Sequence, residues 1–147
     1  MIKKIFVIEG CPANKEEALK MTFEKLYDEK CVKDSFYEGC ITREKSFPTG
    51  LDTKIPVAIP HTDSKHVIVP AVCVLKLDRP ISFCMMEDDT KKVDVNFIFN
   101  MALKSNDDQL DMLNKIIATV QNVEILSNAK NQSDKEFKDR LVSEWIE

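Results

Sequence analysis

The segment KVDVNFIFNMAL, residues 92–103, has the alternating pattern of a β-strand. Its apolar side chains Val93, Val95, Phe97 and Phe99 are separated by single residues, and the first two gaps hold polar ones. This two-residue period, rich in β-branched and aromatic residues, predicts a β-strand with one buried face. The segments VAI (57–59) and AVCVLKL (71–77) are also rich in β-branched residues, and they predict two more strands.

Helical patterns surround this block of strands on both sides. Two precede it and three follow it, and several begin with a polar residue at capping distance from a glutamate, such as Asn14 with Glu17 and Ser133 with Glu136. The second must end before Pro48, because the residue before proline is disfavoured in a helix. The predicted helices are 14–30, 34–45, 105–121, 122–130 and 133–146. We therefore expect an α/β protein: a single-domain sandwich, residues 1–147, with a mixed β-sheet flanked by helices on both faces.

Composition bounds the function. The 147 residues are 44% apolar and 31% charged, as in a globular protein, and the net charge of -4 argues against binding nucleic acid. The N-terminal segment has too few apolar residues for a signal peptide, and Pro70 interrupts the longest apolar run, so a cytoplasmic protein is expected. Five cysteines without a CxxC pair indicate neither disulfides nor a thiolate zinc site, and we expect all five to be buried.

Arg43 lies on the apolar face of the second predicted helix. At 100° per residue it is about 20° from Phe36 and about 60° from Cys40, in the last helical turn. A guanidinium there needs a partner. One interpretation is a structural ion pair with Glu44; the other is that Arg43 points past the helix end and holds an anion in two hydrogen bonds.

A histidine stands at the end of the short strand in IPVAIPH, residues 55–61. Pro56 and Pro60 fix their own φ angles and favour an extended chain, which delivers His61 to an exposed strand end. A neutral imidazole offers one unprotonated nitrogen as a nucleophile. The alternative is an ordinary surface histidine.

The segments REKSFPTG (43–50) and VAIPHTDSKH (57–66) together resemble the enzyme IIA domain of the bacterial phosphoenolpyruvate-dependent sugar phosphotransferase system (PTS), in its mannitol/fructose superfamily. The resemblance covers essentially the whole chain. Within the superfamily the sequence looks most like the galactitol-specific type, because a second histidine follows five residues after the first and QLDML (109–113) begins the late helix.

This resemblance implies a specific role. His61 matches the histidine that accepts a phosphoryl group from the phosphocarrier protein HPr and passes it to a cysteine of the cognate IIB subunit, for uptake of galactitol or a related sugar. Arg43 matches the arginine on the phosphate side and Glu44 its partner. The membrane subunit IIC would be met only indirectly, and no metal or organic cofactor is implied. The alternative is a regulatory IIA-like protein whose phosphorylation state controls other proteins.

Two further residues are candidates for the site. Gln109 lies on the inward face of the first turn of its helix, where its amide could bond a phosphate or His61; alternatively it only fills the sheet edge. His66 is too far along the loop from His61 to form a helical pair of metal ligands. It either faces the active pocket, which we favour, or begins the next strand as a surface residue.

Overall fold

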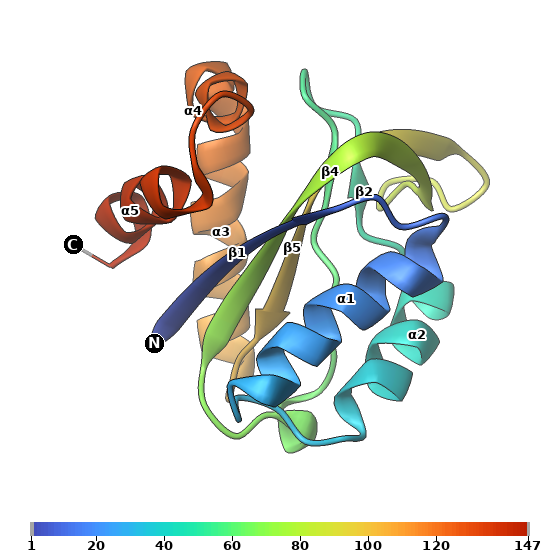
Figure 1. Ribbon diagram of the computed structural model, residues 1–147. Coiled ribbons are helices and arrows are strands. Elements are labelled where there is room, and N and C mark those ends of the chain that lie inside the picture. The colour runs from blue at the N-terminus through green and yellow to red at the C-terminus, as the bar shows by residue number, and fades with distance from the viewer. Residues whose placement is uncertain (1, 147) are drawn as a thin grey trace.

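A five-stranded mixed sheet forms the centre of the computed structural model, which describes residues 2–146 (Figure 1). The strand order is β1-β4-β5-β3-β2. β1 is parallel to β4, β4 is antiparallel to β5, β3 is parallel to β5, and β2 is antiparallel to β3. The bounds are β1 Lys4–Gly10, β2 Gly50–Leu51, β3 Val57–Ala58, β4 Ala71–Cys84 and β5 Lys92–Ala102.

The three predicted strands are present, and the structure adds two. β4 and β5 form a long hairpin whose register shifts between Lys76 and Ile81. The sequence did not predict β1, because its apolar run is only four residues long and its pairing partner lies more than sixty residues later. β2 was also missed; two residues carry no periodic signal.

Helices cover both faces of the sheet, as predicted (Figure 1). One face carries two helices and the other carries three, so the mixed α/β sandwich expected from the sequence is confirmed. The first pair is α1 (Lys15–Asp28) and α2 (Phe36–Ser46); the other three are α3 (Asn106–Gln121), α4 (Val123–Ala129) and α5 (Asp134–Trp145).

Each face of the sheet has its own apolar core. On the α1/α2 side, Phe36 and Cys40 of α2 pack with Cys73 of β4. On the opposite side, Phe99 of β5 packs edge-on against Trp145 of α5, with ring centroids 6.1 Å apart. Phe36 and Cys40 are buried and lie on the same face of α2 as Arg43. Their packing holds this face of the helix against the sheet. The last turn of α2, which carries Arg43, is therefore directed toward the end of β3.

Not every cysteine is buried. Cys11 is exposed, and its sulfur accepts hydrogen bonds from Arg79 Nε and Nη2 at 3.3 and 3.2 Å, while Cys84 is half-buried. The expectation of five buried thiols was wrong for these two. Within residues 2–146, no helix has both the length and the apolar character needed to span a membrane.

Candidate functional site

His61 follows β3 and is held beside β5. It forms an isolated parallel bridge with Met101, whose backbone N–H donates to the Pro60 carbonyl oxygen at 3.0 Å. The His61 side chain is half-buried, not fully exposed as the strand-end position suggested. The main chain at His61 is therefore fixed to β5.

The backbone selects the tautomer of His61. Its Nδ1 lies 3.0 Å from the Ile59 carbonyl oxygen. A carbonyl oxygen only accepts hydrogen bonds, so Nδ1 must carry the hydrogen and donate it. In the neutral ring, Nε2 then keeps the free lone pair.

The His61 ring is also kept neutral. Burial is the largest cause and lowers the pKa of His61; the positive charge of Arg43 lowers this pKa as well. The hydrogen bond to Ile59 and the charge of Asp63 act in the opposite direction. The net pKa lies below the ordinary value, so at neutral pH the ring is a nucleophile and not a cation.

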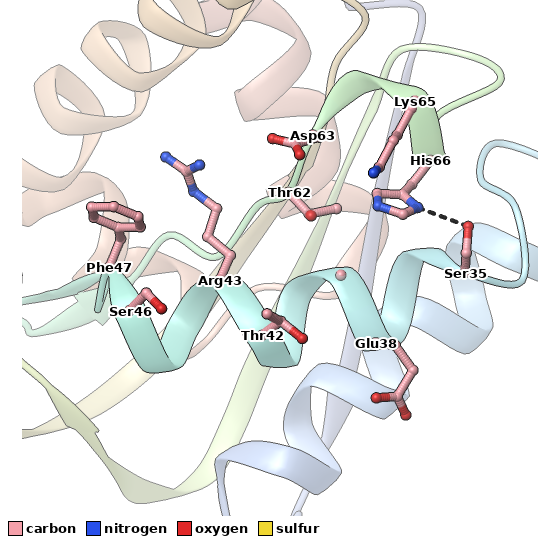
Figure 2. A pocket seen from close by; sticks show the side chains of 11 residues that line it. Ser35, Glu38, Thr42, Arg43, Ser46, Phe47, Thr62, Asp63, Lys65 and His66 are labelled. Carbon is pink, nitrogen blue, oxygen red and sulfur yellow. Dashed lines mark hydrogen bonds between the residues drawn. The ribbon is translucent and has the colours of Figure 1, made fainter.

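Arg43 occupies the last turn of α2, as predicted. Figure 2 shows its side chain rising from the helix toward the segment that carries Thr62 and Asp63. The guanidinium carbon lies 5.0 Å from the centre of the Phe47 ring, a cation–π contact. Its Nε is buried and has no hydrogen-bond partner among the described residues, which leaves a donor for an anion.

Glu44 does not pair with Arg43. Its carboxylate is 4% exposed and accepts hydrogen bonds from the backbone N–H and the hydroxyl of Thr49, at 2.8 and 2.9 Å. No ion pair joins Glu44 to Arg43 in the part of the chain that the structure describes. The expectation that Glu44 would orient Arg43 is therefore not met. The turn after α2 places Thr49 beside the carboxylate, and both carboxylate oxygens accept hydrogen bonds from Thr49 instead.

Thr49 is a site residue that the sequence reasoning missed. Its hydroxyl oxygen also accepts from the backbone N–H of Ile59 at 3.2 Å, so Glu44, Thr49 and Ile59 form a chain that ends at the carbonyl holding His61. Burial raises the pKa of Glu44, against the two Thr49 hydrogen bonds, which lower it. In the sequence, the only signal for this contact is a threonine five residues after a glutamate of the predicted helix.

Gln109 reaches the segment next to His61. Its Nε2 donates to the Thr62 carbonyl oxygen at 3.0 Å, from the first turn of α3. The predicted inward orientation is present, but the amide contacts backbone and not the imidazole. Gln109 thus holds the chain immediately after His61.

His66 lies in a 3-10 turn, Ser64–His66, where its Nδ1 is 2.7 Å from the Ser35 hydroxyl at the start of α2 (Figure 2). It lines a hollow of about 460 Å³ that Arg43 also lines, whereas His61 does not. Burial lowers the pKa of His66, and the charge of Lys65 adds to this. In residues 2–146, no three His, Cys, Asp or Glu side chains are grouped so that they could hold a metal ion.

The fold and the site define a mixed-sheet α/β domain that presents one neutral imidazole with a free Nε2 beside an arginine. Residues 3–144 match the family model described as the phosphoenolpyruvate-dependent sugar phosphotransferase system, EIIA 2. The chain belongs to this family, whose members are phosphotransferase components.

A relative with an assigned sugar is similar over nearly the whole chain. The PTS system galactitol-specific EIIA component of Escherichia coli (strain K12) is 23% identical over 137 residues, which cover 92% of this chain and 91% of the relative.

Solved structures of PTS IIA proteins share the fold. IIA mannitol from Escherichia coli has a TM-score of 0.76 at 20% identity, covering 94% of both chains. The complex of enzyme IIAMTL and phosphorylated enzyme IIBMTL from the same organism gives 0.77 at 19%, covering 95% of this chain and 93% of that one. Nitrogen regulatory protein IIA-Ntr from Neisseria meningitidis gives 0.72 at 20%, covering 93% of this chain and 92% of that one.

Proposed function

We propose that this protein is a phosphocarrier whose His61 accepts a phosphoryl group on Nε2 from HPr and passes it to a cysteine of a cognate IIB subunit. The sugar taken up would be galactitol or a related one. One observation carries the proposal: the Ile59 carbonyl binds Nδ1–H of His61 and leaves Nε2 as the nucleophile.

The chemistry needs no proton transfer at Nε2. The Nε2 lone pair attacks the phosphorus of the phosphohistidine on HPr; the new N–P bond forms as the donor's N–P bond breaks, and the donor imidazole leaves with that electron pair. In the second step a thiolate of IIB attacks the same phosphorus and releases neutral His61. Such loose, in-line transfers depend on positioning and on charge stabilisation, so side chains can suffice without a metal.

The surrounding residues divide this work. Arg43 donates to the phosphoryl oxygens, with an Nε that has no partner among residues 2–146. Glu44 acts through Thr49 to fix the backbone that holds the ring. Gln109 fixes the carbonyl of Thr62 on the other side of His61, and His66 ties the following turn to α2 without contacting the imidazole.

Two exposed apolar side chains suit a docking surface for both partners. Phe47 is 62% exposed under the Arg43 guanidinium, and Leu110, next to Gln109, is 60% exposed. Both carriers must approach Nε2 and then leave, so we expect an interface at or below about 1,200 Å², as in transient encounters. The solved complex of a similar IIA with phosphorylated IIB supports the second partner; contact with IIC would be indirect.

Labelling tests the proposal. With phosphoenolpyruvate and the two general PTS proteins, the chain should gain one acid-labile group of about 80 Da by intact-protein mass spectrometry at neutral pH. His61→Ala should abolish the label, and His66→Gln should keep it. A label that persists in His61→Ala, or disappears in His66→Gln, would overturn the assignment.

A regulatory role is the second candidate. It is favoured by the similar fold of nitrogen regulatory protein IIA-Ntr. Both candidates use the same histidine, so labelling does not separate them. Transfer of the label from the phosphorylated protein to a purified IIB subunit supports transport; a stable label in the presence of every IIB tested supports regulation.

A further inference from the structure

Figure 2 shows the residues that line the hollow, and His61 is not among them. The hollow is bounded by α2 on one side and by residues 62–66 on the other, with a volume of about 460 Å³. Sites for small molecules occupy roughly 300–1,000 Å³. His61 does not line the hollow, but Arg43 does, so an occupant would share the guanidinium without covering the imidazole.

Hydrogen-bond donors lie at both ends of this hollow. Arg43 stands at one end, with a buried Nε that has no partner among residues 2–146. Lys65 and His66 stand at the other end (Figure 2). His66 Nδ1 is occupied by Ser35, and a methyl group placed on Gly39 would lie 3.0 Å from His66 Nε2, so this second nitrogen is at the wall. The carboxylates of Glu38 and Asp63 also line the hollow, so its formal charges balance. The buried Arg43 Nε, which has no partner among residues 2–146, favours an anion at that end of the hollow.

The rest of the lining favours hydroxyl groups. Thr42 and Ser46 supply hydroxyls from α2, and Asp63 supplies a carboxylate from the opposite wall. A carboxylate accepts hydrogen bonds from hydroxyl groups and repels a bare anion. The Arg43 guanidinium lies over the ring of Phe47, the large apolar side chain of the lining, which is otherwise exposed. The hydroxyl groups, the carboxylate and the guanidinium therefore match an anion that carries several hydroxyl groups.

We propose that this hollow binds a phosphorylated polyol, with the phosphate on Arg43 and the hydroxyl groups toward Asp63 and Thr42. Lys65 adds a second positive charge at the other end of the hollow. Binding at Arg43 withdraws the guanidinium from the phosphoryl group on His61, so the ligand slows phosphoryl transfer. This regulatory consequence rests on the proposed function, whereas the binding site does not.

Binding is tested on the unphosphorylated chain without other PTS proteins. The probes are sorbitol 6-phosphate, sorbitol and inorganic phosphate, followed through the backbone amide signals of Thr42, Thr62 and Lys65. Sorbitol 6-phosphate should bind with Kd at or below about 1 mM, and the other two at least tenfold more weakly. Equal binding of inorganic phosphate, or no shift of these amides up to about 10 mM, would overturn the site.

A matched pair of lysines provides the control. Lys65→Gln should raise the Kd for sorbitol 6-phosphate about fivefold or more, because a cation that lines the hollow is lost. Lys45→Gln removes the same charge from the exposed side of α2, outside the lining, and should leave Kd within about twofold. Equal weakening of binding in both variants would mean that only the net charge of the protein matters, and it would overturn the proposal.

The regulatory half of the proposal, that the bound ligand slows phosphoryl transfer, is tested by a separate measurement. Sorbitol 6-phosphate at several times its Kd should slow labelling of His61 from phosphorylated HPr by at least fivefold, whereas sorbitol should not. Binding without slowing would overturn the regulatory half alone. A chain that binds the probe but is never labelled at His61 would instead reject the proposed function.

Discussion

At the scale of single residues, Arg43 and Glu44 have separate tasks although they are adjacent. Glu44 points into the protein and bonds Thr49, while Arg43 has a buried donor without a partner in the described part of the chain. Consecutive helical residues are about 100° apart, so neighbours in sequence need not be neighbours in space. The ion pair suggested by sequence is replaced by a hydrogen-bonded chain that ends at His61.

Arg43→Lys should slow phosphoryl transfer about tenfold or more and change the free energy of unfolding by less than about 1 kcal/mol. An ammonium keeps the charge but loses the planar fork, and no ion pair in residues 2–146 depends on Arg43. Rates of label uptake and urea denaturation measure the two effects. Arg140→Lys, on the surface of α5 beside Glu144, is the control and should alter neither. A loss of roughly 3 to 5 kcal/mol with normal transfer would make Arg43 a structural residue.

Thr49→Val should lower the free energy of unfolding by about 1–3 kcal/mol, because it removes a buried hydrogen bond to the Glu44 carboxylate. The pKa of Glu44 should rise further, since the lost bond is one of those that lower it. Denaturation and NMR titration of the carboxyl group check both. Thr53→Val removes a hydroxyl that bonds the Ile55 carbonyl and not Glu44, so it should leave the Glu44 titration unchanged. Equal titrations in the two variants would contradict the assigned chain.

At the scale of elements, α2 both carries Arg43 and holds the segment after His61. Gly39, in the middle of α2, allows this close approach: a methyl group there would lie 2.7 Å from Thr62 Oγ1 and 3.0 Å from the His66 ring. Ser35 at the start of the same helix bonds His66. One helix therefore sets the position of the guanidinium relative to the histidine segment.

Gly39→Ala tests this coupling. Alanine is the better helix former by about 1 kcal/mol, yet the added methyl group must displace the wall formed by Thr62 and His66. We expect altered His66 ring signals in NMR spectra and slower labelling of His61, with the helix content by circular dichroism retained. Lys45→Ala, at an exposed position of the same helix, should leave both unchanged. A more stable Gly39→Ala protein with unaltered His66 signals would contradict the coupling.

The long elements could be predicted from sequence because their signals are local. The alternation in β5 and the capping residues of α1 and α5 each lie within one segment, and the structure has these elements. β1 and the Thr49 contacts could not be predicted in this way, because they depend on which segments meet in the fold. The proximity of Arg43 and Gln109 to the His61 segment was inferred partly from the family resemblance.

At the scale of the whole molecule, the buried site affects stability. The pKa of His61 is lowered by folding, so the unfolded chain binds this proton at a higher pH than the folded chain does. The free energy of unfolding should therefore fall as the pH drops below about 6.5, and His61→Gln should reduce this fall. Glu44, whose pKa is raised by folding, has the opposite effect on the pH dependence of unfolding. Because Glu44 is present in both the original protein and His61→Gln, its effect cancels when the two are compared. Urea denaturation at pH 7.5 and 5.5 measures the difference; identical pH dependence in both proteins would contradict a lowered His61 pKa.

The hydrogen bond that fixes the His61 tautomer ends on a main-chain oxygen, that of Ile59. A codon change at position 59 alters the side chain but leaves that oxygen in place as long as the local chain path is kept. The identity of the nitrogen that we propose as the nucleophile is thus shielded from point mutation, whereas the guanidinium of Arg43 and the amide of Gln109 can each be lost in one substitution. Descendants of this protein could change what surrounds the imidazole while inheriting the same reactive atom.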